Sequence, residues 1–142
     1  MSASSPVILI VDDDPIFRAL ALQALQAAGY NAFEAADGEI AIDILGNIRA
    51  DLVVTDIMMP NKDGLETIMH LKSTWPSTRI IATSGGMQKT DPNFVLRMAK
   101  NLGADAVFPK PFRLKPFTDL VAEVLVMPAD PCLLYTSDAA DE

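Results

Sequence analysis

Short apolar runs alternate with segments of helical periodicity along this chain of 142 residues, and this alternation limits the folds available to it. The apolar runs lie at residues 7–11, 31–35, 52–56, 79–84 and 104–108. The helical segments between and after them lie at residues 15–28, 38–46, 64–73, 92–102 and 115–126. Strands that alternate with helices in this way indicate βαβ units, in which helices cover both faces of a parallel sheet.

We therefore expect an α/β fold of the flavodoxin-like (βα)5 class, a doubly wound parallel sheet with the strand order 2-1-3-4-5. The start of the first helix supports this, because Asp14-Pro15 combines a capping residue with a proline suited to the first turn. Gly29 is expected to end that helix. Its buried face is expected to consist of Phe17, Leu20, Ala21, Ala24 and Ala28.

Length and composition predict one domain without a membrane segment. We expect residues 7–127 to form this domain, residues 1–6 to be disordered, and residues 128–142 to lie outside the fold. No apolar run approaches the roughly 18 residues of a membrane span, and the N-terminus lacks the basic region of a secretory signal. The formal charge of −8, without a Lys/Arg cluster, argues against binding to nucleic acid, and we expect a cytoplasmic protein.

Polar side chains follow four of the expected strands, at the edge where ligands bind in open α/β sheets. They are Asp12 and Asp13 after the first strand, Asp56 at the end of the third, Ser84 at the end of the fourth, and Lys110 after the fifth. Three carboxylates in one crevice repel each other and require protons or a cation. Mg²⁺ suits such oxygen ligands, while the lysine would add a positive charge and the serine a hydroxyl donor.

This combination of groups suits a tetrahedral anion, because phosphoryl transfer depends mainly on positioning and on neutralising charge. A carboxylate can itself be the nucleophile and form an acyl phosphate. Asp56 is the best candidate for that role because it stands alone on the central strand. The adjacent Asp12 and Asp13 are better suited to holding the metal.

Each of these residues, taken alone, has a simpler explanation. Asp56 could cap a helix, Ser84 could serve the turn that follows it, and Lys110 could be a solvated surface side chain. Asp14 is expected to be a helix cap rather than a ligand, and His70 is expected to face solvent. The occurrence of matching groups at four strand ends together favours a site.

The motifs that carry these residues resemble the receiver domain of two-component response regulators, over residues 7 to about 126. The matching segments are Ile8–Pro15, Asp56–Pro60 with Asp63-Gly64, Ile80–Gly85, and Gly103–Asp105 through Lys110–Phe112. The resemblance implies that Asp56 accepts a phosphoryl group from a phosphohistidine of a histidine kinase or a phosphotransfer protein, with Mg²⁺. Phosphorylation would change binding to a downstream protein target. Such a domain catalyses only its own phosphorylation and dephosphorylation.

The resemblance also implies roles for the other site residues. Asp13 would bind Mg²⁺ directly, Asp12 would bind it mostly through water, and the backbone carbonyl of Met58 would add a ligand. Ser84, rather than its neighbour Thr83, occupies the family's Ser/Thr position and would bond a phosphoryl oxygen. Lys110 would pair with the phosphoryl group.

Two features depart from the family pattern. Receivers usually carry Tyr or Phe three residues before the lysine, where this chain has Val107. Phe108 is adjacent, but an offset of one residue on a strand turns a side chain to the other face. Residues 85–91 also form a longer segment than in the commonest receivers. We therefore expect the output signal to pass through this loop and the fourth helix, which NMR relaxation with and without phosphorylation would test.

The last eleven residues, 132–142, have a different character and include the one cysteine, Cys132. They resemble the translation of a transposase adapter used in sequencing libraries, fused to a truncated reading frame. A natural flexible tail is the alternative. If the segment is an artefact, an output domain could have followed Pro131 in the intact gene.

Two other functions remain open from the sequence. A degenerate receiver would bind partners without phosphorylation, and Val107 leaves room for this. A phosphatase of the haloacid dehalogenase type also uses Asp, Ser/Thr, Lys and Mg²⁺, with its nucleophile at the end of the first strand in an Asp-x-Asp-x-Thr/Val pattern. The segment Asp12-Asp13-Asp14-Pro15-Ile16 lacks that Thr or Val, and turnover of a generic phosphate ester would be needed to support this function.

Overall fold

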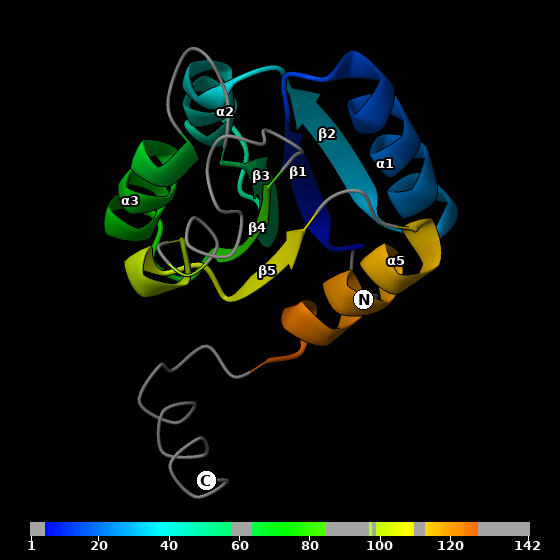
Figure 1. Ribbon diagram of the computed structural model, residues 1–142. Helices are drawn as coiled ribbons and strands as arrows, with labels where there is room; N and C mark the ends of the chain where they lie inside the picture. Colours follow the sequence, from blue (N-terminus) through cyan, green and yellow to red (C-terminus); the bar gives the residue numbers. More distant parts are fainter. Residues whose placement is uncertain (1–4, 58–63, 85–96, 98, 110–112, 128–142) are drawn as a thin grey trace, which may run out of the picture.

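The computed structural model describes residues 5–57, 64–84, 97, 99–109 and 113–127, and within them five parallel strands form one sheet (Figure 1). The strands are β1 (Val7–Val11), β2 (Asn31–Ala35), β3 (Leu52–Asp56), β4 (Arg79–Ser84) and β5 (Ala106–Pro109). Their order is β2-β1-β3-β4-β5, and every neighbouring pair is parallel. The predicted fold class and strand order are confirmed.

Helices cover both faces of this sheet (Figure 1). They are α1 (Pro15–Ala27), α2 (Gly38–Leu45), α3 (Gly64–Thr74) and α5 (Leu114–Leu125). Residues 97 and 99–102 are also helical, and the rest of the fourth predicted helix lies outside the described residues. One hydrophobic core lies between the sheet and the pair α1 and α5, and a second lies under α2 and α3.

The central strands β1, β3 and β4 each contain at least three consecutive apolar residues, because both of their faces are buried. In β1, Ile8 and Ile10 belong to the core under α1 and α5, whereas Leu9 and Val11 belong to the core under α2 and α3. Full burial of such a side chain contributes about 1.5–3 kcal/mol. The strand ends are thereby held rigidly, which fixes where the side chains that follow them lie.

Aspartate side chains cap two of the helices at the edge where the strands end. The Asp14 carboxylate accepts hydrogen bonds from the backbone N–H groups of Ile16 at 3.0 Å and Phe17 at 3.4 Å. Asp37 accepts in the same way from Ile40 at 2.9 Å. Such a cap contributes about 1 kcal/mol. The predicted capping role of Asp14 is therefore confirmed.

The predicted buried face of α1 is partly wrong. Ala21 and Leu25 are fully buried, whereas Leu20 is 48% exposed and Ala28 is also exposed. The helix contacts both the sheet and α5, so the direction of these neighbours decides which stripe is buried. Its buried stripe is rotated by about one residue from the predicted one.

The fifth strand begins two residues later than predicted, at Ala106 instead of Ala104. The N–H of Ala104 donates to the carbonyl of Ala99 at 3.1 Å, so this residue completes the preceding helix. Asp105 then forms two bonds with Ile80: its N–H donates to the Ile80 carbonyl at 2.7 Å, and its Oδ2 accepts the Ile80 N–H at 2.8 Å. The Asp105 side chain thus accepts the N–H of Ile80, which in a longer β5 would bond to a backbone carbonyl.

The ends of the chain lie largely outside the described residues. Residues 1–4 and the predicted tail at 128–142 belong to the parts that are not described. Pro6 is described, and its carbonyl accepts a hydrogen bond from the N–H of Asn31 at 2.9 Å. Among the described helices, none combines the length and apolar character needed to cross a membrane.

Candidate functional site

Three carboxylates gather where β1 and β3 end. Asp12 directly follows β1, Asp13 is the next residue, and Asp56 is the last residue of β3. Each offers a ligand atom, and these atoms all lie within 4.8 Å of one another. Asp12 is fully buried, Asp56 is only 4% exposed, and Asp13 is exposed to solvent. The first three predicted site residues therefore come together as one cluster, which we call the acid cluster.

One hydrogen bond to β2 and one within the turn after β1 hold Asp12 in place. Its N–H donates to the carbonyl of Ala35 at 3.1 Å, which extends the pairing of β1 with β2. Its Oδ1 accepts the N–H of Asp14 at 2.9 Å. Asp14 itself points back to cap α1. Of the three consecutive acids, Asp12 and Asp13 therefore belong to the acid cluster, and Asp14 caps α1.

Arg18 is a residue near the acid cluster that the sequence did not lead us to predict. Its Nη1 donates to the backbone carbonyl of Asp12 at 2.8 Å, and its Nε donates to Oε1 of Glu34 at 2.8 Å. The guanidinium therefore joins α1, the end of β1 and the end of β2. The available signal was an arginine one turn into the helix that follows the acids, close enough to fold back over them.

The end of β3 is held by its neighbour β4. Asp56 lies opposite Thr83 in the register, and the N–H of Ile57 donates to the Thr83 carbonyl at 2.9 Å. The Thr55 hydroxyl donates to the backbone carbonyl of Asp56 at 3.1 Å. Because the backbone is fixed on both sides of Asp56, its carboxylate starts from a defined position.

The acid cluster has the chemistry of a site for a hard cation. At 4.8 Å and an effective dielectric constant of about 20, two ionised carboxylates repel each other by about 3 kcal/mol. Carboxylate oxygens are the ligands that Mg²⁺ takes in proteins, usually one or two of them with waters completing the shell. Asp12, Asp13 and Asp56 therefore fit a magnesium ion.

The other predicted site residues are only partly covered by the structure. Ser84 is the last residue of β4 and lies opposite Pro109 of β5, so its backbone stands at the same edge of the sheet. The Ser84 side chain is not among the described parts of the structure, and Lys110 and Met58 also lie outside the described residues. Their predicted roles stay predictions.

The departure at the usual aromatic position has a clear structural consequence. Val107 packs into the core under α2 and α3, whereas Phe108 packs into the core under α1 and α5. The ring of Phe108 lies 6.4 Å from that of Phe117 in α5. The prediction that these two neighbours face opposite sides of the sheet is confirmed.

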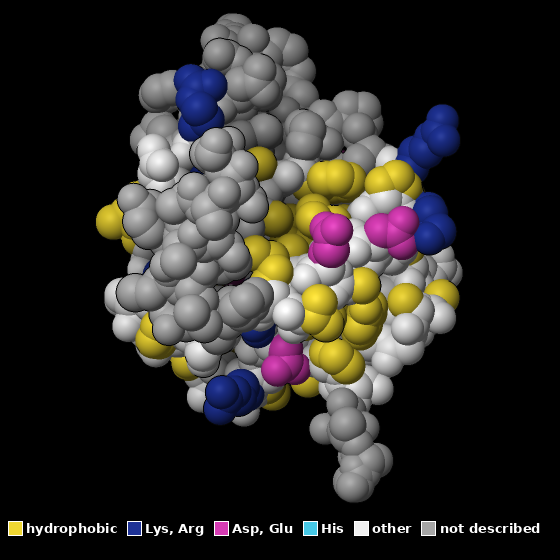
Figure 2. Space-filling model, turned by 90° about the horizontal axis from the view of Figure 1, so that it is seen from below, with side chains coloured by type: hydrophobic (Ala, Val, Ile, Leu, Met, Phe, Trp, Pro, Cys, Tyr) yellow, Lys and Arg dark blue, Asp and Glu magenta, His cyan; other side chains and the backbone are white. Residues whose placement is uncertain are grey.

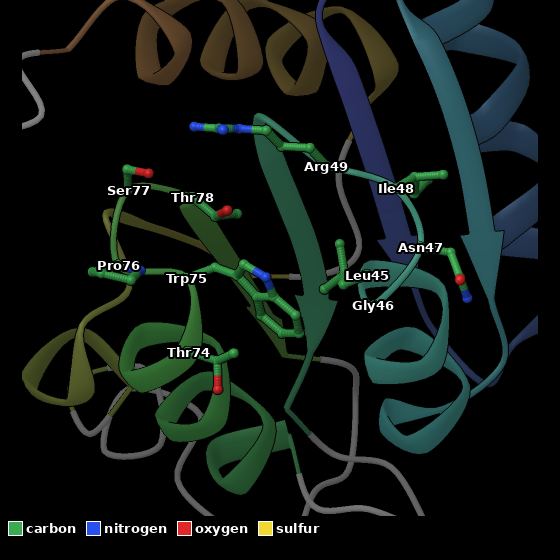
Figure 3. Close-up of a pocket in the computed structure, with 10 residues that line it drawn as sticks. All are labelled: Leu45, Gly46, Asn47, Ile48, Arg49, Thr74, Trp75, Pro76, Ser77 and Thr78. Carbon is green, nitrogen blue, oxygen red and sulfur yellow. The ribbon is translucent and has the colours of Figure 1, made fainter.

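The edge where the strands begin contains a separate pocket of about 410 Å³ (Figure 3). Residues at the C-terminal ends of α2 and α3 and in the segments that follow them form its walls, and the ring of Trp75 points toward Leu45. His70 is exposed, as predicted. Its ring stacks on that of Trp75, with the two ring centroids 6.2 Å apart. None of the predicted site residues lines this pocket.

Comparison with known proteins agrees with the fold. A family model described as the response regulator receiver domain matches residues 8–122. The chain is 37% identical over 130 residues to the sensor kinase CckA of Brucella abortus, which covers 88% of this chain and 13% of CckA. It is 38% identical over 117 residues to the transcriptional regulatory protein CpxR of Escherichia coli, which covers 82% of this chain and 47% of CpxR.

Solved structures give the same result. A CheY-like receiver domain protein from Methanospirillum hungatei aligns with a TM-score of 0.78 and 29% identity, over 86% of this chain and 94% of that one. The chemotaxis protein CheY4 of Vibrio cholerae aligns with a TM-score of 0.75 and 28% identity, over 84% of this chain and 98% of that one. The chain spans less than half the length of the curated relatives CckA and CpxR. It belongs to the response regulator receiver domain family.

Proposed function

We propose that this domain is the phosphoacceptor of a two-component phosphorelay. Asp56 takes a phosphoryl group from a phosphohistidine of a histidine kinase or a phosphotransfer protein, and phosphorylation changes binding to a downstream protein. The observation that supports this is the acid cluster, in which a buried carboxylate at the end of the central strand lies within 4.8 Å of two further acids. Membership of the receiver family supports the same reaction class.

In the proposed reaction, a carboxylate oxygen of Asp56 attacks the phosphorus atom. The new P–O bond forms as the P–N bond to the donor histidine breaks, and the imidazole leaves with the electron pair of that bond. Asp12, Asp13 and Asp56, with the backbone carbonyl of Met58, would hold Mg²⁺, which offsets the negative charge of the phosphoryl oxygens. The Ser84 hydroxyl and the Lys110 ammonium are proposed to bond the remaining phosphoryl oxygens.

The scaffold supports this proposal through preorganisation. Asp12 and Asp56 lie at the ends of the buried strands β1 and β3. Arg18 donates hydrogen bonds to the carbonyl of Asp12 and to Glu34 of β2, and so links the two strand ends. Acids held in this way need little rearrangement when a divalent ion and a phosphoryl group arrive. We propose that the domain comprises residues 7–127, acts in the cytoplasm, and turns over no other substrate.

Intact mass spectrometry after incubation with Mg²⁺ and phosphoramidate tests this function. We expect the wild type to gain one phosphoryl group, and we expect EDTA or Asp56→Asn to abolish the gain, because the substitution removes the nucleophile. Asp51→Asn, which changes an acid at the opposite edge of the sheet, is the matched control and keeps the gain. A folded wild type that gains no mass would support a degenerate receiver instead.

A further inference from the structure

The hydroxyl of Thr83 is the feature of the site edge that the proposed reaction does not yet use. Thr83 is fully buried, and its Oγ1 forms no hydrogen bond with any group in the described part of the chain. On burial, such a hydroxyl loses its hydrogen bonds to water and forms none within the protein, so it destabilises the fold. Valine has nearly the same shape and would avoid this cost.

Two other buried threonines in the described sheet region do have partners. The Thr55 hydroxyl donates to the carbonyl of Asp56 at 3.1 Å, and the Thr78 hydroxyl donates to the carbonyl of Ala50 at 3.2 Å. Thr78 lies just before β4, whereas Thr83 lies near the end of the same strand. Of these three threonines, Thr83 is the one whose hydroxyl has no partner in the described part of the chain, and it lies at the edge of the acid cluster, as Thr55 does.

The strand register places Thr83 directly beside Asp56. The two residues are partners across β3 and β4, and partners in parallel strands present their side chains on the same face. On its other side Thr83 is partnered with Phe108, whose ring packs toward Phe117. Of these two neighbours, Asp56 is the one whose side chain, or a group attached to it, can accept a strong hydrogen bond.

We infer that Thr83 is a further residue of this site and that its hydroxyl donates a hydrogen bond to the phosphoryl group carried by Asp56. This inference rests on the proposed function. A hydrogen bond from a neutral donor to a charged oxygen is stronger than one between neutral groups, and stronger still away from water. The hydroxyl that destabilises the free domain therefore stabilises the phosphorylated one, and the difference favours the phosphorylated state.

The experiment compares Thr83→Val with the wild type in two states. Melting temperatures are measured in EDTA, and again with Mg²⁺ and beryllium trifluoride, which mimics a phosphoryl group on a carboxylate. We expect Thr83→Val to melt at a higher temperature than the wild type in EDTA, and to bind beryllium trifluoride about tenfold more weakly. Thr83→Ser keeps the hydroxyl and is expected to bind as tightly as the wild type.

Thr78→Val is the matched control, since it removes a buried hydroxyl that has a partner at the opposite edge. We expect it to lower the melting temperature in EDTA and to leave beryllium trifluoride binding unchanged. Equal binding by the wild type and Thr83→Val would overturn the inference, as would a lower melting temperature of Thr83→Val in EDTA. A wild type that does not bind beryllium trifluoride at all would instead contradict the proposed function.

Discussion

Aspartates stand at both edges of the sheet, but their surroundings differ. Asp51 and Asp105 each come one residue before a strand, β3 or β5, whereas Asp12 directly follows β1 and Asp56 ends β3. Asp51 exchanges two hydrogen bonds with Val7 of β1: its N–H donates to the Val7 carbonyl at 2.8 Å, and its Oδ2 accepts the Val7 N–H at 2.8 Å. Asp105 forms the same pair of bonds with Ile80 of β4.

The direction of the strands explains this difference. In a parallel sheet, the backbone groups left over where strands begin include N–H groups, and a carboxylate can accept from them. Where strands end, the groups left over are carbonyls, which cannot donate to a carboxylate. An acid that follows a strand must therefore find its partners in a turn, a helix terminus or a cation.

The two edges also differ in how their charges are spread. The edge where the strands begin carries scattered acidic side chains among hydrophobic ones, with Lys and Arg side chains on the same face (Figure 2). At the other edge, the ligand atoms of three acids lie within 4.8 Å of one another. The acids before the strands complete the pairing of the sheet, whereas the acids at the ends of β1 and β3 gather into the acid cluster.

The largest expected effect is the loss of metal binding when the acid cluster loses a charge. We expect Asp13→Asn to weaken Mg²⁺ binding by more than about 100-fold, because changing groups that only support a metal ligand already costs about 10–100-fold. Isothermal titration calorimetry measures this affinity. Asp14→Asn is the matched control, since Asn also caps helices well, and it should bind Mg²⁺ as the wild type does.

The next effect concerns the opposite edge and the stability of the fold. We expect Asp105→Ala to lower the free energy of unfolding by about 2 kcal/mol, because it leaves the N–H of fully buried Ile80 without its acceptor. Urea denaturation measures the change. Asp119→Ala removes an exposed acid that pairs with Lys115, and it should cost less than about 0.5 kcal/mol. Wild-type stability in Asp105→Ala would show that this carboxylate does not stabilise the edge where the strands begin.

A smaller loss of metal affinity is expected from changing Arg18, which donates a hydrogen bond to the backbone of Asp12 in the acid cluster. We expect Arg18→Ala to weaken Mg²⁺ binding by about tenfold, the lower end of the range for supporting residues. Arg18→Lys keeps the charge but cannot reach both the Asp12 carbonyl and Glu34 with one planar group, so it should recover only part of the affinity. Full recovery by lysine would mean that charge alone matters.

The smallest effect is expected at Asp51. Its side chain forms the same bond as that of Asp105, but it is exposed, so water can replace it at the N–H of Val7. We expect Asp51→Ala to lower the free energy of unfolding by about 0.5–1 kcal/mol. Urea denaturation beside Asp105→Ala checks the ranking, and a larger loss at Asp51 would show that burial is not what separates the two.

The sequence was sufficient for the order of the strands and for the acid cluster. Apolar runs broken by Asp, Gly and Pro mark the strand ends, and the parallel topology then brings Asp12 and Asp56 to one edge. The role of Asp105 could not be predicted, because nothing in the local pattern shows that its carboxylate accepts from the N–H of Ile80 in another strand.

The sequence pattern also could not predict features that depend on neighbours in space. The exposure of Leu20 and the burial of Leu25 follow from where α1 meets the sheet and α5, and the helical period alone does not fix that direction. The bonds of Arg18 depend on the bend between β1 and α1, which brings the guanidinium back over the carbonyl of Asp12. Both are consequences of packing rather than of local sequence.

The most direct test asks whether Asp105 stabilises the fold while Asp13 binds the metal. The free energy of unfolding is measured in EDTA and again in Mg²⁺, for the wild type, Asp13→Asn and Asp105→Ala. At ten times its dissociation constant, Mg²⁺ should stabilise the wild type by about 1.4 kcal/mol. We expect Asp13→Asn to lose this stabilisation by Mg²⁺ but to be as stable as the wild type in EDTA. We expect Asp105→Ala to be less stable than the wild type in EDTA and in Mg²⁺, but still to be stabilised by Mg²⁺. A loss of stability by Asp13→Asn in EDTA as large as that of Asp105→Ala would contradict the account.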